Sequence, residues 1–246
     1  MKYTATIDIG NTRTKLVVFN EVGEVVSTWV DPDLEAIFED IKPSKCIYSS
    51  VRRMDAGGLD REILDFLLLH EAIEFGPHLC STLQIGIEEV ETLGRDRLAG
   101  IMGARFLYAR NQCLVIDAGT CITYDYLTEG NFYGGGAISM GLEMRYRALN
   151  HFTQKLPKLR FDDLDSKGMI GNDIGDKTNR AIHSGVLGGL FDELNARTDR
   201  FRSNFADSAI ILTGGDADFL VKHIKNEIFV EPLLVHYGLY YALHSV

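Results

Sequence analysis

Residues 7–19 read IDIGNTRTKLVVF, in which a hydrophobic strand enters a polar Asp-x-Gly turn and a second strand leaves it. Residues 115–127 read VIDAGTCITYDYL and repeat the arrangement. The two aspartates, Asp8 and Asp117, are 117 − 8 = 109 residues apart, about the length of one small domain. An internal repeat of this length indicates two copies of one structural unit.

The segments that follow each turn also correspond. A hairpin leads into a third strand, at residues 25–30 in the first copy and from residue 132 in the second. Three strands followed by alternating helices and strands, twice over, predict an α/β fold of two tandem ribonuclease-H-like domains, residues 1–112 and 113–246. Hydrophobic periodicity predicts helices at 34–41, 60–70, 98–110, 141–151, 178–200, 219–225 and 237–243, and further strands at 45–50 and 209–212.

The composition excludes several classes of protein. The 246 residues are 46% hydrophobic and 24% charged, as in an ordinary globular protein. The net charge is −10, and no Lys/Arg stripe offsets it, so we expect no nucleic-acid partner. There is no hydrophobic run of about 18–20 residues and no export signal, which predicts a cytoplasmic protein without a membrane partner. Four scattered cysteines without a C-x-x-C pair predict buried thiols rather than a zinc site.

The first Asp-x-Gly turn has the chemistry of a phosphate loop. A glycine lets the backbone approach a phosphate, and the amides and hydroxyls of Asn11, Thr12 and Thr14 can donate hydrogen bonds to it. Lys15 adds a mobile positive charge. Asp8 is then placed to hold Mg²⁺, directly or through water, between the β- and γ-phosphates of ATP.

The alternative is that Asp8 caps a hairpin turn, and one such motif does not separate the two interpretations. The second turn, with Asp117 and Thr120, favours phosphate binding. The chain has neither the G-x-x-x-x-G-K-[ST] loop nor a G-x-G-x-x-G turn after a strand, so other common nucleotide motifs are absent.

Residues 93–98, LGRDRL, place an acid between two arginines just before a predicted helix. Asp96 could accept a proton from an attacking hydroxyl while Arg97 binds a substrate carboxylate through its planar guanidinium. The alternative is a helix cap with surface ion pairs, and this segment alone favours the cap.

Two glycine runs carry equally balanced alternatives. Residues 134–136, all glycine, either bind an anion or allow close strand–helix packing. Residues 213–217, TGGDA, either offer a flat surface to a base or ribose or form a plain strand-to-helix turn.

Together these segments resemble the type III pantothenate kinases over nearly the whole chain. Residues 8–15, DIGNTRTK, resemble the first phosphate motif of that family, D-x-G-N-T. Residues 94–97, GRDR, resemble its G-x-D-R motif, and residues 117–120, DAGT, its second phosphate motif. Residues 135–157 resemble the helix after the second repeat, and residues 178–185 resemble the dimer-facing helix. The fold group is that of acetate kinase, sugar kinases, Hsp70 and actin.

The resemblance implies transfer of the ATP γ-phosphate to the 4′-hydroxyl of pantothenate, the first step of coenzyme A biosynthesis, in a homodimer. It makes Asp96 the catalytic proton acceptor. It implies that Mg²⁺ accompanies ATP and that Asp117 binds a monovalent cation, K⁺ or NH₄⁺. The implied substrate-binding residues are Gly94, Arg95, Arg97 and, across the dimer, Thr178, and the implied ATP-binding residues are Asp8, Ile9, Gly10, Asn11, Thr12, Arg13, Thr14, Lys15 and Thr120.

The sequence departs from the family in several places, among them Cys121 and Gln154, which replace residues that are usually small. The tyrosine common shortly before G-x-D-R is missing from residues 87–92, and Met140 stands where proline is frequent. Two other functions stay open on the sequence: a non-catalytic nucleotide-binding regulator of the same fold, and a kinase for another small hydroxy acid.

Overall fold

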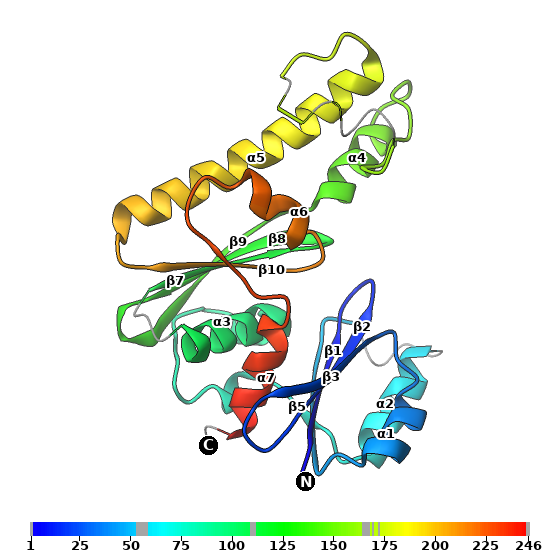
Figure 1. The fold of residues 1–246 in the computed structure, drawn as a ribbon, viewed down its shortest axis with the longest axis vertical. Coiled ribbons are helices and arrows are strands. Elements are labelled where there is room, and N and C mark those ends of the chain that lie inside the picture. Colours follow the sequence, from blue (N-terminus) through cyan, green and yellow to red (C-terminus); the bar gives the residue numbers. More distant parts are fainter. Residues whose placement is uncertain are drawn as a thin grey trace. The chain divides into compact units, whose positions relative to one another are not determined.

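The computed structural model describes residues 2–52, 59–108, 112–163, 168, 170–171 and 173–244. The chain divides into two compact units (Figure 1). Unit 1 comprises residues 1–111, 127–135 and 233–246, and unit 2 comprises residues 112–126 and 136–232. Neither unit is continuous in sequence, and the linear domain boundary between residues 112 and 113 stays a prediction.

The first sheet contains the first Asp-x-Gly copy. Strand β1 pairs antiparallel with β2 and parallel with β4; β3 and β5 complete the order β3-β2-β1-β4-β5. The strands are β1 (Thr4–Ile9), β2 (Thr14–Phe19), β3 (Val25–Val30), β4 (Lys45–Ser50) and β5 (Ile73–Glu74).

The second sheet repeats this topology around the second copy. Its order is β11-β10-β7-β8-β9-β6, with β10 parallel to both β7 and β11. Strand β7 thus has the place that β1 has in the first sheet, which confirms the predicted tandem α/β fold. The strands are β6 (Gln84–Ile85), β7 (Cys113–Ala118), β8 (Cys121–Thr128), β9 (Phe132–Met140), β10 (Ala209–Thr213) and β11 (Phe229–Val230).

In unit 1, helices cover both faces of the first sheet (Figure 1). Alternate residues of β1 point to opposite faces, so Ala5, Ile7 and Ile9 pack with α1 (Leu34–Ile41) and α2 (Leu59–Leu69). Thr6 faces the other way and contacts α7 (Leu234–His244), where its Oγ1 lies 2.9 Å from His236 Nδ1. The same alternation places Asp8 on the face that α7 covers.

Helix α3 (Arg95–Leu107) packs closely against α7. A Cβ at Gly238 would clash with the carbonyl oxygen of Ala99, and one at Gly103 with the carbonyl of Leu234. The two glycines therefore let the helix backbones touch. This contact fixes the start of α3 relative to β1.

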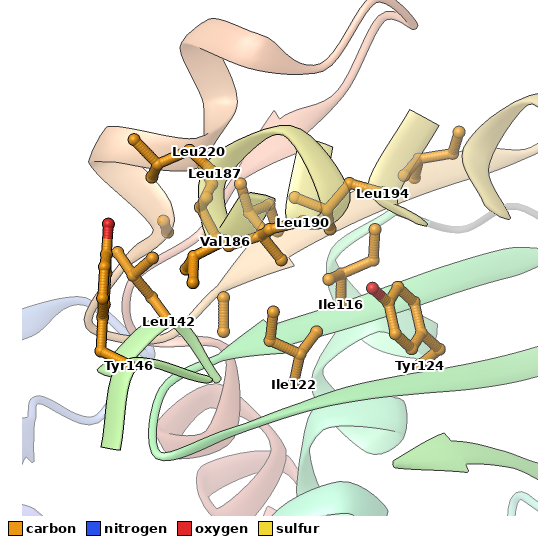
Figure 2. Packing of buried hydrophobic residues seen from close by; sticks show 14 of the residues in the cluster. Ile116, Ile122, Tyr124, Leu142, Tyr146, Val186, Leu187, Leu190, Leu194 and Leu220 are labelled. Carbon is orange, nitrogen blue, oxygen red and sulfur yellow. The ribbon is translucent and has the colours of Figure 1, made fainter. Parts of the chain in front are cut away.

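In unit 2, the core lies between the second sheet and the long helix α5 (Thr178–Asn204), with α4 (Leu142–His151) and α6 (Ala217–Leu220) beside it (Figure 2). Leu187, Leu190 and Leu194 of α5 are buried in the cluster that holds Ile116 of β7. Each fully buried leucine contributes about 1.5–3 kcal/mol. Asp117, the next residue of β7, points to the opposite face.

Several predicted boundaries were wrong. Helix α3 begins at Arg95, three residues before the predicted start, and α5 continues to Asn204. The predicted helix 219–225 is instead α6 followed by a short 3-10 turn. The strand predicted from residue 132 was correct, and residues 134–136 lie inside it as part of β9. Among the described residues, 3-10 turns also occur at Pro77–Leu79, Val90–Thr92 and Glu129–Asn131. Within the described residues, no helix is both long and apolar enough to span a membrane.

Candidate active site

The first phosphate loop, loop 1, comprises residues 8–15, which are the end of β1, the turn after it and the start of β2. The Gly10 amide donates a hydrogen bond to the Arg13 carbonyl, with N···O 3.0 Å, which closes the turn. Asn11, Thr12 and Arg13 are exposed at its tip. Arg52, just after β4, donates from Nε to the Gly10 carbonyl at 2.6 Å. Loop 1 is therefore a tight turn supported by a guanidinium from a neighbouring strand end.

The exit of loop 1 is held by Asp31, which follows β3. Its carboxylate Oδ1 accepts from the Thr14 amide at 2.9 Å, and its own amide donates to the Thr14 carbonyl at 2.7 Å. Asp31 has φ +50°, a left-handed conformation that aspartate tolerates better than most residues. Side chains thus hold both ends of loop 1.

Asp8 lies in a row of polar residues across the first sheet. Its register partners are Lys15 on β2 and Ser49 on β4, and the Ser49 hydroxyl donates to Asp8 Oδ1 at 3.4 Å. Burial, followed by the negative charge of Asp96, raises the pKa of Asp8 to about 6, while Lys15 and Ser49 act in the opposite direction. Two carboxylates that repel each other beside a lysine form a site that a cation would stabilise.

The predicted acid–arginine segment forms the first turn of α3. Gly94 is the N-cap, and a Cβ there would lie 2.6 Å from Asp96 Oδ1, so a larger residue would displace the Asp96 carboxylate. Asp96 Oδ1 accepts from the Arg97 amide at 2.8 Å. Arg95 lies 3.7 Å from Glu91, whose side chain is exposed. The segment was predicted to precede the helix; it is inside it, because Gly94 rather than Arg97 ends the preceding turn.

Asp96 therefore bonds to a helix amide, as a cap would, and also lies close enough to Asp8 to raise its pKa. The second property is not expected of a surface cap, because an exposed charge is screened by water. Within unit 1 the structure brings Asp8, Lys15 and Asp96 together.

The second phosphate loop, loop 2, comprises residues 117–120 between β7 and β8, in unit 2. The Gly119 amide donates to the Cys121 carbonyl at 2.9 Å, and Thr120 is exposed. The Asp216 amide donates to the Ala118 carbonyl at 3.0 Å. Loop 2 is thus held by backbone groups.

Two glycines from other segments lie directly against loop 2. Gly214 has φ +96°, and a Cβ there would clash with the Ala118 carbonyl and lie 2.5 Å from Asp117 Oδ1. A Cβ at Gly141, the N-cap of α4, would clash with the Gly119 and Thr120 carbonyl oxygens. The TGGDA turn therefore packs on loop 2, and its predicted contact with a base or ribose stays a prediction.

The run of glycines at 134–136 has a packing reason at its last position. A Cβ at Gly136 would clash with the Tyr124 carbonyl of the adjacent β8. Close packing explains this glycine. The close neighbour is a strand rather than the predicted helix, and anion binding by the run stays a prediction.

Thr178, at the start of α5, is exposed and opens onto a groove of about 610 Å³ in unit 2. The groove is mostly apolar, and among the described residues that line it Arg145 alone is charged. The other lining residues are Met140, Ala148, Leu149, Leu156, Ala181, Ile182, Gly185 and Val186.

The described residues contain no group of three or more His, Cys, Asp or Glu side chains placed to hold a metal ion. A Mg²⁺ ion near Asp8 would therefore need oxygen ligands from elsewhere. Mg²⁺ commonly takes one or two carboxylates and completes its shell with phosphates and water. The pair Asp8 and Asp96, which repel each other, fits an ion that arrives with ATP.

Sequence reasoning missed the residues that support the loops. Arg52, Asp31 and Ser49 are 17 to 42 residues from their partners, and no local pattern marks them. Only the register of β1 with β4, and of β2 with β3, could have pointed to them.

Comparison with known proteins supplies the family. The sequence model of type III pantothenate kinase matches residues 5–200. The chain belongs to this family. It is 39% identical over 234 residues to the type III pantothenate kinase of Flavobacterium johnsoniae, covering 91% of this chain and 90% of that one. It is 34% identical over 243 residues to that of Porphyromonas gingivalis, covering 97% of each chain.

Solved structures with low sequence identity share the fold. An activator of the 2-hydroxyisocaproyl-CoA dehydratase from Clostridium difficile, with bound ADPNP, has TM-score 0.54 at 14% identity and covers 99% of this chain and 96% of that one. A glucokinase from an Antarctic psychrotroph has TM-score 0.52 at 11% identity and covers 100% of both chains. These likenesses support the fold group alone. Family membership identifies the chain as an ATP-dependent kinase, as the loops predicted.

Proposed function

We propose that this member of the type III pantothenate kinases transfers the γ-phosphate of ATP to the 4′-hydroxyl of pantothenate, with Asp96 as the proton acceptor. Family membership supports the reaction. The observation that carries the role of Asp96 is its proximity to Asp8, which is the register partner of Lys15 in unit 1. A non-catalytic regulator is not favoured, because relatives over nearly the whole length are kinases.

Asp96 would take the proton from the attacking hydroxyl, while the neighbouring residues bind the substrate. Arg97 and Arg95 offer guanidinium groups to the pantothenate carboxylate, and Gly94 leaves room for the Asp96 carboxylate. Thr178 adds a substrate contact from the partner subunit in this proposal. Phosphoryl transfer needs mainly positioning and charge neutralisation, and these groups supply both.

The nucleotide phosphates would bind to loop 1 and to Thr120. The exposed tip residues Asn11, Thr12 and Arg13 are accessible to a ligand, and Gly10 lets the backbone approach it. Ile9 and Thr14 are buried and set the ends of the loop. Lys15 and Asp8 would meet the phosphates and Mg²⁺ respectively. A cytoplasmic location is part of this proposal, because ATP is the phosphoryl donor.

Asp117 would hold the monovalent cation, K⁺ or NH₄⁺. The Oδ1 atom of Asp117 lies against Gly214. The Gly119 and Thr120 carbonyls, which belong to the same loop as Asp117, lie against Gly141. Carboxylate and carbonyl oxygens are hard ligands of the type that such ions bind. Exchanging K⁺ for Na⁺ should therefore lower activity of the wild type, and Asp117→Asn should weaken the response to K⁺.

The proposal also includes a homodimer whose interface lies on α5. Gly185, Gly188 and Gly189 of this helix meet no neighbouring atom within 4 Å where a Cβ would stand. Glycine inside a helix costs about 0.5–1 kcal/mol relative to alanine, and no packing among the residues that the structure describes explains these three. Close approach of a second copy would explain them. Gly185→Leu should shift the protein from dimer to monomer in sedimentation analysis; an unchanged dimer would place the interface elsewhere.

A coupled assay of ADP release tests the reaction. We expect pantothenate to stimulate ADP release, and other small hydroxy acids and sugars to give little. Asp96→Asn should lower kcat by about 10²–10⁴ with a small change in the KM for ATP, because the base acts mainly in the transition state. No stimulation by pantothenate would overturn the substrate, and near-normal turnover of Asp96→Asn would remove this residue from the base role.

A further inference from the structure

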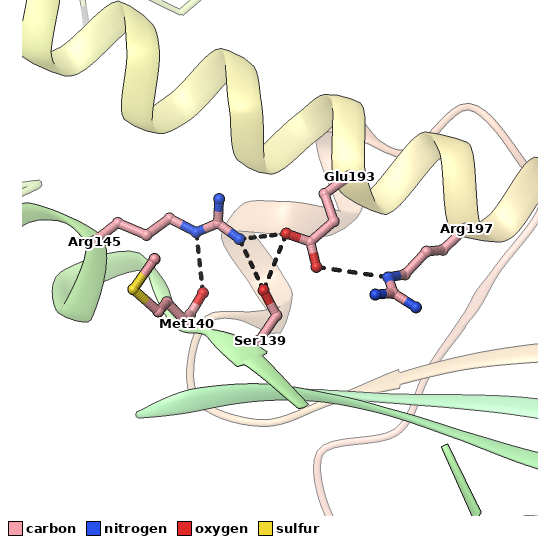
Figure 3. Close-up of polar contacts among 5 residues, drawn as sticks. All are labelled: Ser139, Met140, Arg145, Glu193 and Arg197. Atoms are coloured by element: carbon pink, nitrogen blue, oxygen red, sulfur yellow. Dashed lines mark hydrogen bonds and ion pairs between the residues drawn. The ribbon is translucent and has the colours of Figure 1, made fainter. Parts of the chain in front are cut away.

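Unit 2 contains a largely buried ion pair that the proposed reaction does not use (Figure 3). Arg145 of α4 and Glu193 of α5 contact through Nη2 and Oε2, and their side chains are only 15% and 22% exposed. The Ser139 hydroxyl donates to the same Glu193 oxygen at 3.1 Å. Removing two charges from water is costly, so we expect the contacts of this pair to have a specific geometric role.

Arg145 also binds the end of strand β9. Its Nε donates to the Met140 carbonyl at 3.0 Å, and Nη2 donates to Ser139 Oγ at 3.2 Å. Its guanidinium therefore joins α5, through Glu193, to the two residues that precede Gly141 (Figure 3). A planar fork can make these bonds at once, which a lysine ammonium at one point cannot do in the same geometry.

The other oxygen of Glu193 faces Arg197, whose Nε lies 3.6 Å away. Arg197 in turn lies over the Tyr124 ring, with Cζ 4.3 Å from the centroid. Burial by itself would raise the pKa of Glu193, but the hydrogen bonds from Arg145 and Ser139, together with the positive charge of Arg145, act in the opposite direction, and the pKa is lowered. The carboxylate is consequently charged at neutral pH.

The segment that Arg145 binds, residues 139–141, lies directly against loop 2. Gly141 follows Met140 directly, and its Cα lies so close to the Gly119 and Thr120 carbonyls that a Cβ would clash with both. A shift of residues 139–141 would therefore move loop 2 or separate it from α4. The path from Glu193 to loop 2 passes through Arg145 and three consecutive residues of the backbone.

We propose that Arg145 and Glu193 are positioning residues that fix loop 2 in the geometry that binds the nucleotide phosphates. This inference rests on the proposed role of Thr120 in ATP binding. The contacts described above connect the pair to loop 2 through residues 139–141. A well-packed apolar pair of similar size often stabilises a fold as well as a buried ion pair does, so the value of these charges lies in the geometry they impose.

The test is the kinetics of Arg145→Met, Glu193→Leu and the double variant. We expect the KM for ATP to rise and kcat to fall, with kcat/KM for ATP lowered by about 10- to 100-fold, because small misplacements have effects of this size. The KM for pantothenate should change less than about threefold. The single variants each leave a buried charge without its partner and can lose stability.

The double variant separates folding from positioning. It removes both charges, so its melting temperature should lie nearer the wild-type value than those of the single variants. Its loss in kcat/KM for ATP should match that of Arg145→Met rather than the product of the two, because the residues act as one unit. Arg145→Lys should have a kcat/KM for ATP between that of Arg145→Met and that of the wild type.

Arg202→Gln is the matched control on the same helix. Arg202 donates to the Ser208 carbonyl at 2.7 Å and to the Glu227 carbonyl at 3.1 Å, at the far end of α5. It should lower stability without changing the KM for ATP. Thr120→Ala is the reference for loop 2, and it should raise the KM for ATP.

Each contrary result is distinct. Normal ATP kinetics in a folded double variant would overturn the positioning role alone. A rise in the KM for pantothenate with ATP kinetics unchanged would also overturn it, since Arg145 would then act through the groove it lines. An unchanged KM for ATP in Thr120→Ala would overturn the proposed nucleotide role of loop 2, and the inference with it.

Discussion

Loop 1 and loop 2 share the Asp-x-Gly sequence and follow the corresponding strands β1 and β7, but different groups support them. In loop 1, the Arg52 guanidinium and the Asp31 carboxylate bind the backbone from neighbouring strand ends. In loop 2, Gly141 and Gly214 bring their backbones into direct contact with the loop. A repeated motif thus preserves the turn while its supports differ.

The difference has a physical consequence for substitution. A side-chain hydrogen bond is lost at a cost of about 0.5–1.5 kcal/mol, or more when the group is charged, and the loop can relax. A backbone contact leaves no room for an added methyl group, and the surrounding segments must move. Loop 2 should therefore tolerate change less than loop 1.

The largest effect is expected at Gly214. Alanine there combines a clash with the Ala118 carbonyl and a left-handed backbone at φ +96°. Overpacking of about 1–3 kcal/mol and a left-handed penalty of about 1–2 kcal/mol together lower the free energy of unfolding by roughly 3 kcal/mol. Urea denaturation followed by circular dichroism measures the loss.

Gly215→Ala is the matched control, because a Cβ at Gly215 meets nothing within 4 Å. We expect its free energy of unfolding to stay within about 0.5 kcal/mol of the wild type. Equal losses in the two variants would mean that any side chain in this turn lowers the free energy of unfolding. Contact with loop 2 would then not explain the loss at Gly214.

The next effect concerns the buried charge of loop 1. The folded pKa of Asp8 is about 6, above the ordinary value of 3.8, so stability is lost as pH rises between these values. Asp8→Asn removes the charge, so the variant does not lose stability from this residue as the pH rises. Without nucleotide, the variant should be more stable than the wild type by about 3 kcal/mol at pH 8 and nearly equal to it near pH 3.5.

Thermal or urea unfolding at the two pH values gives the comparison, and a difference that does not depend on pH would show that Asp8 is not strained by burial and by Asp96. The same variant should bind Mg²⁺-ATP poorly. Greater stability with lost activity is the expected sign of a functional charge.

The sequence predicted the fold because the determining signals are local and occur twice. Helix α1 and strands β3 and β4 were predicted with the observed bounds, since each has a clear hydrophobic period and turn residues at its ends. The start of α3 was misplaced, because Gly94 supplies no side-chain cap and the charged residues after it look like a loop.

The sequence predicted only those residues of the candidate site that lie in recognisable motifs. Asp8, Asp96 and Asp117 stand in recognisable segments, and strand alternation explains why Asp8 faces α7. The supports do not stand in motifs: Arg145 and Glu193 are 48 residues apart and meet only when α4 packs against α5. Tertiary contacts of this kind leave no periodic trace in a single sequence.

A smaller effect is expected at Arg52. Arg52→Met removes the 2.6 Å hydrogen bond to the Gly10 carbonyl and should lower the free energy of unfolding by about 1–2 kcal/mol. The KM for ATP should rise several-fold, because the tip of loop 1 loses a support. Arg61→Met is the control: its ion pair with Asp65 is exposed, and such pairs contribute little. A change in stability without a change in KM would make Arg52 structural only.

The smallest effect is expected at Asp31, where two substitutions separate the acceptor from the charge. Asp31→Ala loses the hydrogen bond from the Thr14 amide and places alanine at φ +50°, which should lower the free energy of unfolding by about 1 kcal/mol. Asp31→Asn keeps an acceptor oxygen and tolerates that backbone, so urea denaturation should show a loss within about 0.5 kcal/mol. If asparagine were as harmful as alanine, the negative charge would be the important property. Loop 1 would then be held by electrostatics rather than by the bonds that distinguish it from loop 2.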